Sequence, residues 1–261
     1  MPWQPSQYLQ FAGERLRPAL DLLARIPLDR PRTIVDLGCG AGNVTKILGE
    51  RWPDARIIGV DSSPEMLEAA RAATQAEPRY TFVAADLAQW QPDVPVDLVY
   101  SNAALHWLPD HAALFARVAA MVARPGALAV QMPDNFRTPS HTSISALARS
   151  ERWRAKLGSL VREAPVAGAA DYFGWLAPLM AGVDIWLTDY LHVLQPRKDG
   201  EHPVAAWTKG TWLVPFLVAL DDAERAEFLR EYVRELTVMY PARSDGSTLF
   251  PFRRLFIVAN R

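Results

Sequence analysis

The sequence is poor in cysteine, with Cys39 the single example among 261 residues. One thiol excludes an intrachain disulfide and any metal site built from several thiolates. Such a chain is typical of a reducing compartment, so we expect a cytoplasmic protein. The sequence also lacks an apolar run of about 18 residues, and it does not start with a basic segment followed by an apolar one. From these absences we expect no membrane span and no export.

An excess of charge of one sign is also missing. The 28 Lys and Arg side chains are offset by 29 Asp and Glu, and no basic run is long enough to mark a nucleic-acid groove. We therefore expect neither nucleic acid nor a membrane as a partner. Half of the residues are hydrophobic and 22% are charged, which is typical of a globular chain with a large core. The length suits one α/β domain carrying an insertion.

Strand and helix patterns alternate over the first half of the chain. Apolar segments that end at glycine or at a polar residue predict five strands: "TIVDLG" (33–38), "ARIIGVD" (55–61), "RYTFVAAD" (79–86), "VDLVYSN" (96–102) and "GALAVQMPD" (126–134). Amphipathic stretches between them predict helices, and Ser63 followed by Pro64 is typical of a helix start. This alternation predicts an α/β fold with a Rossmann-like, doubly wound sheet.

The alternation breaks after Pro133. The following stretch is mostly helical in pattern, and two later segments, "VDIWLTDYLHVL" (183–194) and "TLFPFRRLFIVAN" (248–260), predict strands on either side of a long helix. We predict an N-terminal helical segment over 1–30, a Rossmann-like domain over 31–135 and 183–261, and a helical insertion over 136–182 that forms a substrate cap.

Three glycines follow the first predicted strand. Gly38, Gly40 and Gly42 give the spacing GxGxG at a strand-to-helix turn, where glycine lets the backbone approach a ligand closely. Asp61 ends the next strand, 19 residues after Gly42, near the spacing of about 20 at which a carboxylate accepts ribose hydroxyls. Asp86 ends the third strand, where a carboxylate is placed to accept from an adenine amine. The pattern predicts an adenosine ligand, although each aspartate alone is also typical of a helix cap.

A nicotinamide cofactor is the main alternative ligand. It carries a pyrophosphate, which prefers the longer GxGxxG turn and a free helix N-terminus. The shorter GxGxG spacing of this chain therefore disfavours a nicotinamide-dependent oxidoreductase.

Four stretches resemble the successive motifs of class I S-adenosylmethionine-dependent methyltransferases: "VDLGCGAGN" (35–43), "GVDSSPEML" (59–67), "AADL" (84–87) and "VDLVYSNAALHWL" (96–108). The resemblance implies a sheet of seven strands with the last strand antiparallel. It implies S-adenosyl-L-methionine as the cofactor and S-adenosyl-L-homocysteine as its product. It also implies that the N-terminal segment closes over the cofactor as a lid.

The same resemblance assigns roles to residues that match the motifs. The methionine and ribose portion would lie along the glycines, the ribose hydroxyls at the second strand end, the adenine at the third and the sulfonium near the fourth. The cofactor-binding residues implied in this way are Asp36, Gly38, Gly40, Gly42, Asp61, Ser62, Asp86, Leu87, Asn102 and Ala103.

A narrower resemblance covers nearly the whole chain. "MPWQPSQYLQFAGERLRPALDLLARI" (1–26), "LHWLPDH" (105–111), "VQMPDN" (130–135) and "RLFIVA" (254–259) are similar to a branch of this family that esterifies one carboxylate of a small polycarboxylic acid. This branch implies an O-methyltransferase with a polycarboxylate substrate. The cofactor motifs leave open another acceptor, on oxygen, nitrogen or carbon, and a non-catalytic S-adenosylmethionine-binding module.

Methyl transfer to a carboxylate depends on positioning, because the sulfonium is already electrophilic and the acid is already ionised at pH 7. We therefore assign no certain catalytic residue and no metal, and expect Arg254, Trp107, His106 and Tyr8 to position the substrate. A polyanion in a dry pocket needs cations, and arginine offers a two-pronged partner. Arg254 is the preferred cation, with Arg253, Lys209, Arg15 and Arg17 as alternatives.

Overall fold

The computed structural model describes residues 12–75 and 77–261. These residues form two compact units. The first, here the sheet unit, comprises Arg15–Pro133, Pro165–Thr188 and Arg254–Arg261. The second, here the helical unit, is built mainly from Asp134–Ala164 and Asp189–Arg253. Each unit is described by itself below.

Five parallel strands form the body of the sheet unit. Their bounds are β1 (Thr33–Leu37), β2 (Arg56–Asp61), β3 (Tyr80–Ala84), β4 (Val96–Asn102) and β5 (Val122–Pro133). Strand β1 pairs in parallel with both β2 and β4, and the outer pairs β2–β3 and β4–β5 are also parallel. The central strands are buried on both faces, which is why they read as continuous apolar runs. The predicted doubly wound sheet is confirmed.

Two long strands complete the sheet. They are β6 (Gly182–Leu194) and β7 (Thr248–Asn260), and β7 pairs antiparallel with β5. Within the described residues the sheet has seven strands in the order β3-β2-β1-β4-β5-β7-β6. The seven-stranded sheet with an antiparallel last strand is therefore confirmed.

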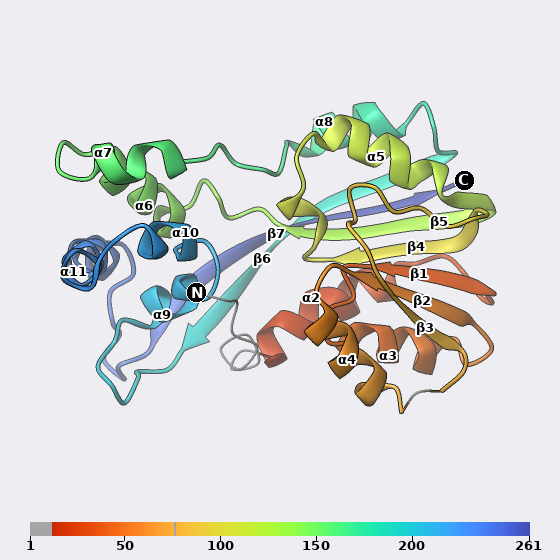
Figure 1. Ribbon diagram of the computed structural model, residues 1–261, viewed down its shortest axis with the longest axis horizontal. Coiled ribbons are helices and arrows are strands. Elements are labelled where there is room, and N and C mark those ends of the chain that lie inside the picture. Colours follow the sequence, from red (N-terminus) through yellow and green to blue (C-terminus); the bar gives the residue numbers. More distant parts are fainter. Residues whose placement is uncertain (1–11, 76) are drawn as a thin grey trace. The chain divides into compact units, whose positions relative to one another are not determined.

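Helices of the sheet unit lie where the amphipathic patterns predict them. They are α2 (Ala12–Ala24), α3 (Asn43–Arg51), α4 (Pro64–Ala73), α5 (His111–Ala120) and α8 (Ala169–Leu176), with a 3₁₀ turn η1 (Leu105–Trp107). Helix α4 starts as expected, with the Ser63 side chain accepting from the Met66 N–H and Pro64 at the first position. In Figure 1, α5 and α8 lie together beside β5, and α3 and α4 lie along β2 and β3.

The helical unit has its own hydrophobic core. Its helices are α6 (Pro139–Arg149), α7 (Arg154–Leu157), η2 (Gly158–Leu160), α9 (Pro203–Lys209), α10 (Val214–Val218) and α11 (Asp222–Met239). Ile144, Trp207, Phe228 and Phe250 are among its buried side chains. The hydroxyl group of Tyr232, buried in this core, donates to the Ser140 carbonyl at 2.8 Å. These buried side chains form one contiguous cluster within the helical unit, to which the ends of β6 and β7 also contribute.

The chain divides differently from the predicted insertion at 136–182. Residues 165–188 belong to the sheet unit and 189–253 to the helical unit, so the boundary falls inside both β6 and β7. Helix α8 packs on α5, and the hydroxyl of Tyr172 on α8 lies 2.5 Å from His111 Nδ1 on α5. These contacts hold α8 to the sheet unit. Residues 1–11 of the predicted lid, including Tyr8, lie outside the described residues.

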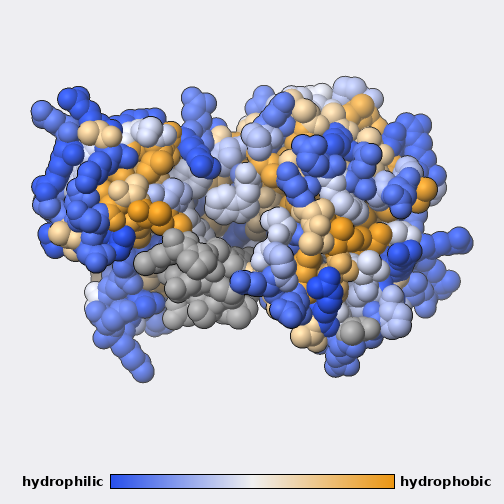
Figure 2. Space-filling model, viewed as in Figure 1, coloured by the Kyte–Doolittle hydropathy of each residue, from blue (hydrophilic) through white to orange (hydrophobic). Residues whose placement is uncertain are grey.

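The surface is mixed in character. Figure 2 shows hydrophilic side chains over much of the visible face, with hydrophobic ones between them in both units. None of the helices in the described part of the chain has the length and apolar composition needed to cross a membrane.

Candidate functional site

The glycine turn after β1 has a backbone that only glycine adopts readily. Gly38 has φ of 78°, and a Cβ there would meet the Ala104 Cβ at 2.1 Å. Gly40 has φ of 52°, and a Cβ there would meet no atom within 4 Å. The Gly38 and Cys39 amides donate to the Val60 carbonyl at 2.8 and 3.1 Å, which fixes the turn to β2. The turn therefore combines a rigid base with open space at Gly40.

Asp61 ties the glycine turn to the start of α4. Its Oδ2 accepts from the Gly40 N–H at 3.0 Å and its Oδ1 accepts from the Ser63 N–H at 2.9 Å. The carboxylate is half-buried and the neighbouring Ser62 is exposed. An ionised carboxylate has about four lone-pair positions, so each oxygen keeps capacity for a further donor such as a hydroxyl group.

Asp36 is a nearly inaccessible carboxyl group at the end of β1, with an exposed fraction of 2%. Burial raises its pKa from 3.8 to about 7; a hydrogen bond from Thr45 opposes this rise and the charge of Asp61 adds to it. The Thr45 hydroxyl donates to Asp36 Oδ2 at 2.6 Å. A cationic group beside Asp36 would favour its ionised form.

The loop after β3 is held by a residue that sequence reasoning missed. Asp86 is exposed, and its Oδ1 accepts from the Ala88 N–H at 2.9 Å. Leu87 is half-buried. Arg117 on α5 donates to the Leu87 carbonyl at 2.5 Å and to the Trp90 carbonyl at 2.7 Å. The guanidinium thus fixes the backbone on which both predicted adenine contacts lie.

The end of β4 carries an unusual backbone. Ala103 has φ of 53°, a left-handed conformation that is uncommon for alanine. Its N–H donates to the Gln131 carbonyl at 2.9 Å. The neighbouring Asn102 has a buried Oδ1 that accepts no hydrogen bond within the described part of the chain. A strained backbone next to an unsatisfied buried acceptor is typical of a functional site.

A buried cationic group lies on β7, which β5 separates from β4 in the sheet. Arg254 has an exposed fraction of only 5%, and its Nη1 donates to Gln131 Oε1 at 3.4 Å. Burial and the Arg254 charge lower the pKa of His106 to about 3, so His106 is neutral at pH 7. The His106 ring lies 4.7 Å from the ring of Trp107, which is 56% exposed. Arg254, His106 and Trp107, three of the four predicted positioning residues, belong to the sheet unit.

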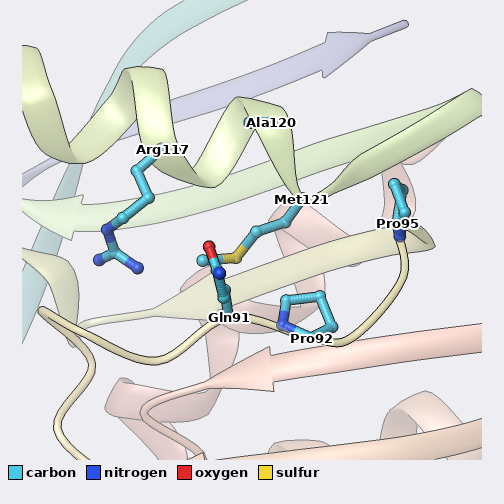
Figure 3. Close-up of a pocket in the computed structure, with 6 residues that line it drawn as sticks. All are labelled: Gln91, Pro92, Pro95, Arg117, Ala120 and Met121. Carbon is cyan, nitrogen blue, oxygen red and sulfur yellow. The ribbon is translucent and has the colours of Figure 1, made fainter.

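The small pocket in Figure 3 lies elsewhere. It measures about 100 Å³ and is lined by Gln91, Pro92, Pro95, Arg117, Ala120 and Met121. Three of these residues directly precede β4, and the other three lie in the last turn of α5 or directly after it, so the pocket lies at the amino end of β4. Asp36, Asp61 and Asn102 stand at carboxyl ends of their strands, where open α/β sheets bind ligands. A pocket of this size is also smaller than the roughly 300 to 1,000 Å³ of most ligand sites.

Known proteins resemble this chain closely. A family model described as a methyltransferase domain matches residues 34–126. The trans-aconitate 2-methyltransferase of Methylobacterium radiotolerans is 46% identical over 266 residues, covering 99% of this chain and 98% of that protein. The enzyme of the same name from Azoarcus sp. is 46% identical over 259 residues, with 99% of each chain covered. The chain belongs to the trans-aconitate 2-methyltransferase family.

Membership of this family confirms the predicted S-adenosylmethionine-dependent methyltransferase. It also argues against the nicotinamide-dependent oxidoreductase. Among solved structures, the YcgJ protein from Bacillus subtilis has a similar fold, with a TM-score of 0.62 and 17% identity, covering 94% of this chain and 98% of that one.

The other cations proposed for this methyltransferase have different surroundings. Arg253 is exposed and donates from Nε and Nη2 to both carboxylate oxygens of Asp189, at 2.8 and 2.9 Å. Lys209 forms an ion pair with Glu201. Arg17 is exposed on α2, and the side chains of Arg15 and Tyr8 lie outside the described part of the molecule. Among these candidate cations whose side chains the structure describes, Arg254 alone is buried, and it belongs to the sheet unit. No cluster of His, Cys, Asp and Glu in the described residues could hold a metal ion.

A further pair of residues supports the η1 turn of the methyltransferase. His111 Nε2 lies 3.2 Å from the Leu105 carbonyl, and Nδ1 lies 2.5 Å from the Tyr172 hydroxyl. Tyr172 in turn accepts from the Ala167 N–H at 3.2 Å. The carbonyl can only accept, so Nε2 carries the proton and Nδ1 accepts from Tyr172. This series of hydrogen bonds fixes the turn that carries His106 and Trp107.

The raised pKa of Asp36 predicts a pH-dependent stability. Between about pH 4 and 7 the folded protein keeps a proton on Asp36 that the unfolded chain has lost, so the stabilisation present below pH 4 is lost as the pH rises to 7. Asp36→Asn mimics the protonated group and still offers an oxygen to Thr45. The unfolding free energy of the wild type should therefore fall, relative to that of Asp36→Asn, by a few kcal/mol over this range. Urea unfolding of both proteins from pH 4 to 8 measures the difference, and parallel pH curves would contradict it.

Proposed function

We propose that this methyltransferase transfers the methyl group of S-adenosylmethionine to one carboxylate of trans-aconitate, with S-adenosylhomocysteine as the second product. The family to which the chain belongs supports the reaction class and the substrate class. One observation of the structure carries the substrate assignment. The buried guanidinium of Arg254 donates to Gln131, which lies opposite Asn102 in the sheet, where the reactive end of the cofactor is predicted. A buried cation is what a polyanionic acid needs in order to leave water.

The sheet edge offers groups that fit each part of the cofactor. Asp61 would accept from the ribose hydroxyls, and the open backbone at Gly40 would let the ligand approach. Asp36 would bind the amino group of the methionine portion, because a positive charge beside it would offset the cost of ionising a buried carboxyl group. The remaining predicted contacts are Gly38, Gly42 and Ser62 in the first two loops, Asp86 and Leu87 at the adenine, and Asn102 and Ala103 at the sulfonium end.

The residues of the chain then act by positioning. The cofactor supplies an electrophilic methyl group when it is bound. The acceptor carboxylate is ionised at pH 7, so no general base is required, which agrees with a buried, neutral His106. Arg254 would pair with a carboxylate that is not methylated and so align another oxygen with the methyl carbon. Trp107 and Tyr8 would complete the surroundings of the acid.

Two segments of the chain would enclose the substrate and the cofactor. Residues 136–182 would serve as a substrate cap and residues 1–30 as a lid, although the two compact units divide the chain at other positions. The single thiol, on the buried Cys39, agrees with a cytoplasmic enzyme.

Transfer of labelled methyl from S-adenosylmethionine to a panel of acids tests the function directly. The panel should contain trans-aconitate, cis-aconitate, citrate and isocitrate. We expect trans-aconitate to have the highest kcat/KM and its monomethyl ester to accumulate in step with S-adenosylhomocysteine. Transfer to none of these acids, by protein that binds S-adenosylhomocysteine, would refute the substrate class and leave the family assignment intact.

Arg254→Lys should raise the KM for trans-aconitate more than it lowers kcat. Lysine keeps the charge but loses the two-pronged geometry, and a contact made in both ground and transition states acts mainly on binding. We expect kcat/KM to fall on the order of tenfold to a hundredfold, with the affinity for S-adenosylhomocysteine unchanged. Arg253→Lys is the matched control, because Arg253 is exposed and paired with Asp189. Equal kinetics for Arg254→Lys and Arg253→Lys would remove Arg254 from the substrate site.

A further inference from the structure

Gln131 is a buried amide in the "VQMPDN" stretch (130–135), and neither the sequence motifs nor the family assignment gives it a role. Resting on the function proposed above, we propose that Gln131 determines substrate specificity: its amide oxygen orients Arg254, and its amide nitrogen donates to the same unmethylated carboxylate of the acid.

The sheet register brings the groups together. Gln131 lies opposite Asn102 on the parallel strand β4. On the other side, β7 runs antiparallel to β5, with Phe256 opposite Gln131 and Arg254 opposite Pro133. Gln131 thus lies between the predicted sulfonium end of the cofactor, at Asn102, and the predicted carboxylate partner, Arg254. Its side chain is fully buried, so its position is set by packing.

The hydrogen bond to Arg254 fixes which way the amide faces. A guanidinium has five N–H donors and no acceptor, so the Gln131 atom beside Arg254 Nη1 must be the oxygen. The amide nitrogen must then point elsewhere. The orientation follows from chemistry and does not depend on how the two similar atoms are assigned.

The amide nitrogen of Gln131 is a donor in need of an acceptor. Within the described residues, Gln131 Nε2 is buried and makes no hydrogen bond. Leaving such a group unsatisfied is costly, and native proteins keep few of them. The buried Asn102 Oδ1 does not satisfy it, because that oxygen also lacks a partner. A ligand oxygen is the kind of group that would.

A carboxylate is the ligand that fits a guanidinium and an amide N–H together, because it accepts at both oxygens. The amide adds a donor without adding a charge. The pair therefore carries one positive charge, which matches the single negative charge of one carboxylate. Sites built to hydrogen-bond a group reject analogues that lack it far more strongly than apolar pockets do. The pair therefore selects acids with a further carboxylate over monocarboxylic acids.

Two substitutions test the inference with steady-state kinetics. Gln131→Met keeps the approximate length and removes both polar atoms, and we expect it to raise the KM for trans-aconitate on the order of tenfold with little change in kcat. Gln131→Glu keeps the shape and gives Arg254 an anionic partner that repels the substrate, so we expect a rise on the order of a hundredfold. S-adenosylhomocysteine affinity should be unchanged in both. Gln91→Glu, the same change in the pocket of Figure 3, should leave the KM at the wild-type value.

A double variant separates donation to the substrate from orientation of Arg254. If Gln131 donates to the acid, Gln131→Met should still raise the KM several-fold when it is added to Arg254→Lys. If adding Gln131→Met to Arg254→Lys has no effect, or if Gln131→Glu alone has the wild-type KM, the inference is overturned while the proposed function stands. Failure of the wild type to methylate any polycarboxylate would overturn both.

Discussion

The candidate site depends on the carboxylate of Asp61 and its two backbone partners. By accepting from the Gly40 and Ser63 amides, one side chain joins the glycine turn after β1 to the first turn of α4. These two bonds add to those from the Gly38 and Cys39 amides to the Val60 carbonyl, which fix the turn to β2. Asp61 is therefore a structural residue as well as a predicted ligand contact. The two readings of a strand-end aspartate, cap or ribose partner, are compatible at this position.

The sheet unit buries one acidic and one basic side chain near the candidate site. Asp36 is buried near the glycine turn with a pKa of about 7, and Arg254 is buried near the ends of β4 and β5. Burying a charge is costly unless the group is paired and hydrogen-bonded. In the proposed function each group meets its complement, the methionine ammonium at Asp36 and an acid carboxylate at Arg254. A ligand of opposite charge at each group would offset part of the cost of burying it.

Local sequence patterns predicted the sheet well and the divisions of the chain poorly. Apolar runs located all seven strands, and Ser63-Pro64 located the start of α4, because these signals are short-range. The assignment of residues 165–188 to the sheet unit depends on α8 packing against α5, with Tyr172 and His111 separated by 61 positions. Gln131 escaped notice for the same reason: its partner Arg254 is 123 positions away. Arg117 was missed because it holds a loop about 30 positions earlier in the sequence. Thr45 was missed because its partner is Asp36, and no sequence pattern shows that this carboxyl group is buried.

Calorimetric titration of S-adenosylhomocysteine into the wild type, Asp61→Ala and the exposed control Asp54→Ala tests the central claim most directly. The account predicts that Asp61→Ala loses about 1.5 to 3 kcal/mol of binding free energy, because ribose hydroxyls lose a charged acceptor and the turn loses its anchor. Asp54→Ala should bind as the wild type does. Unchanged affinity in a folded Asp61→Ala protein would place the ribose elsewhere and contradict the assignment of the glycine turn as the cofactor site.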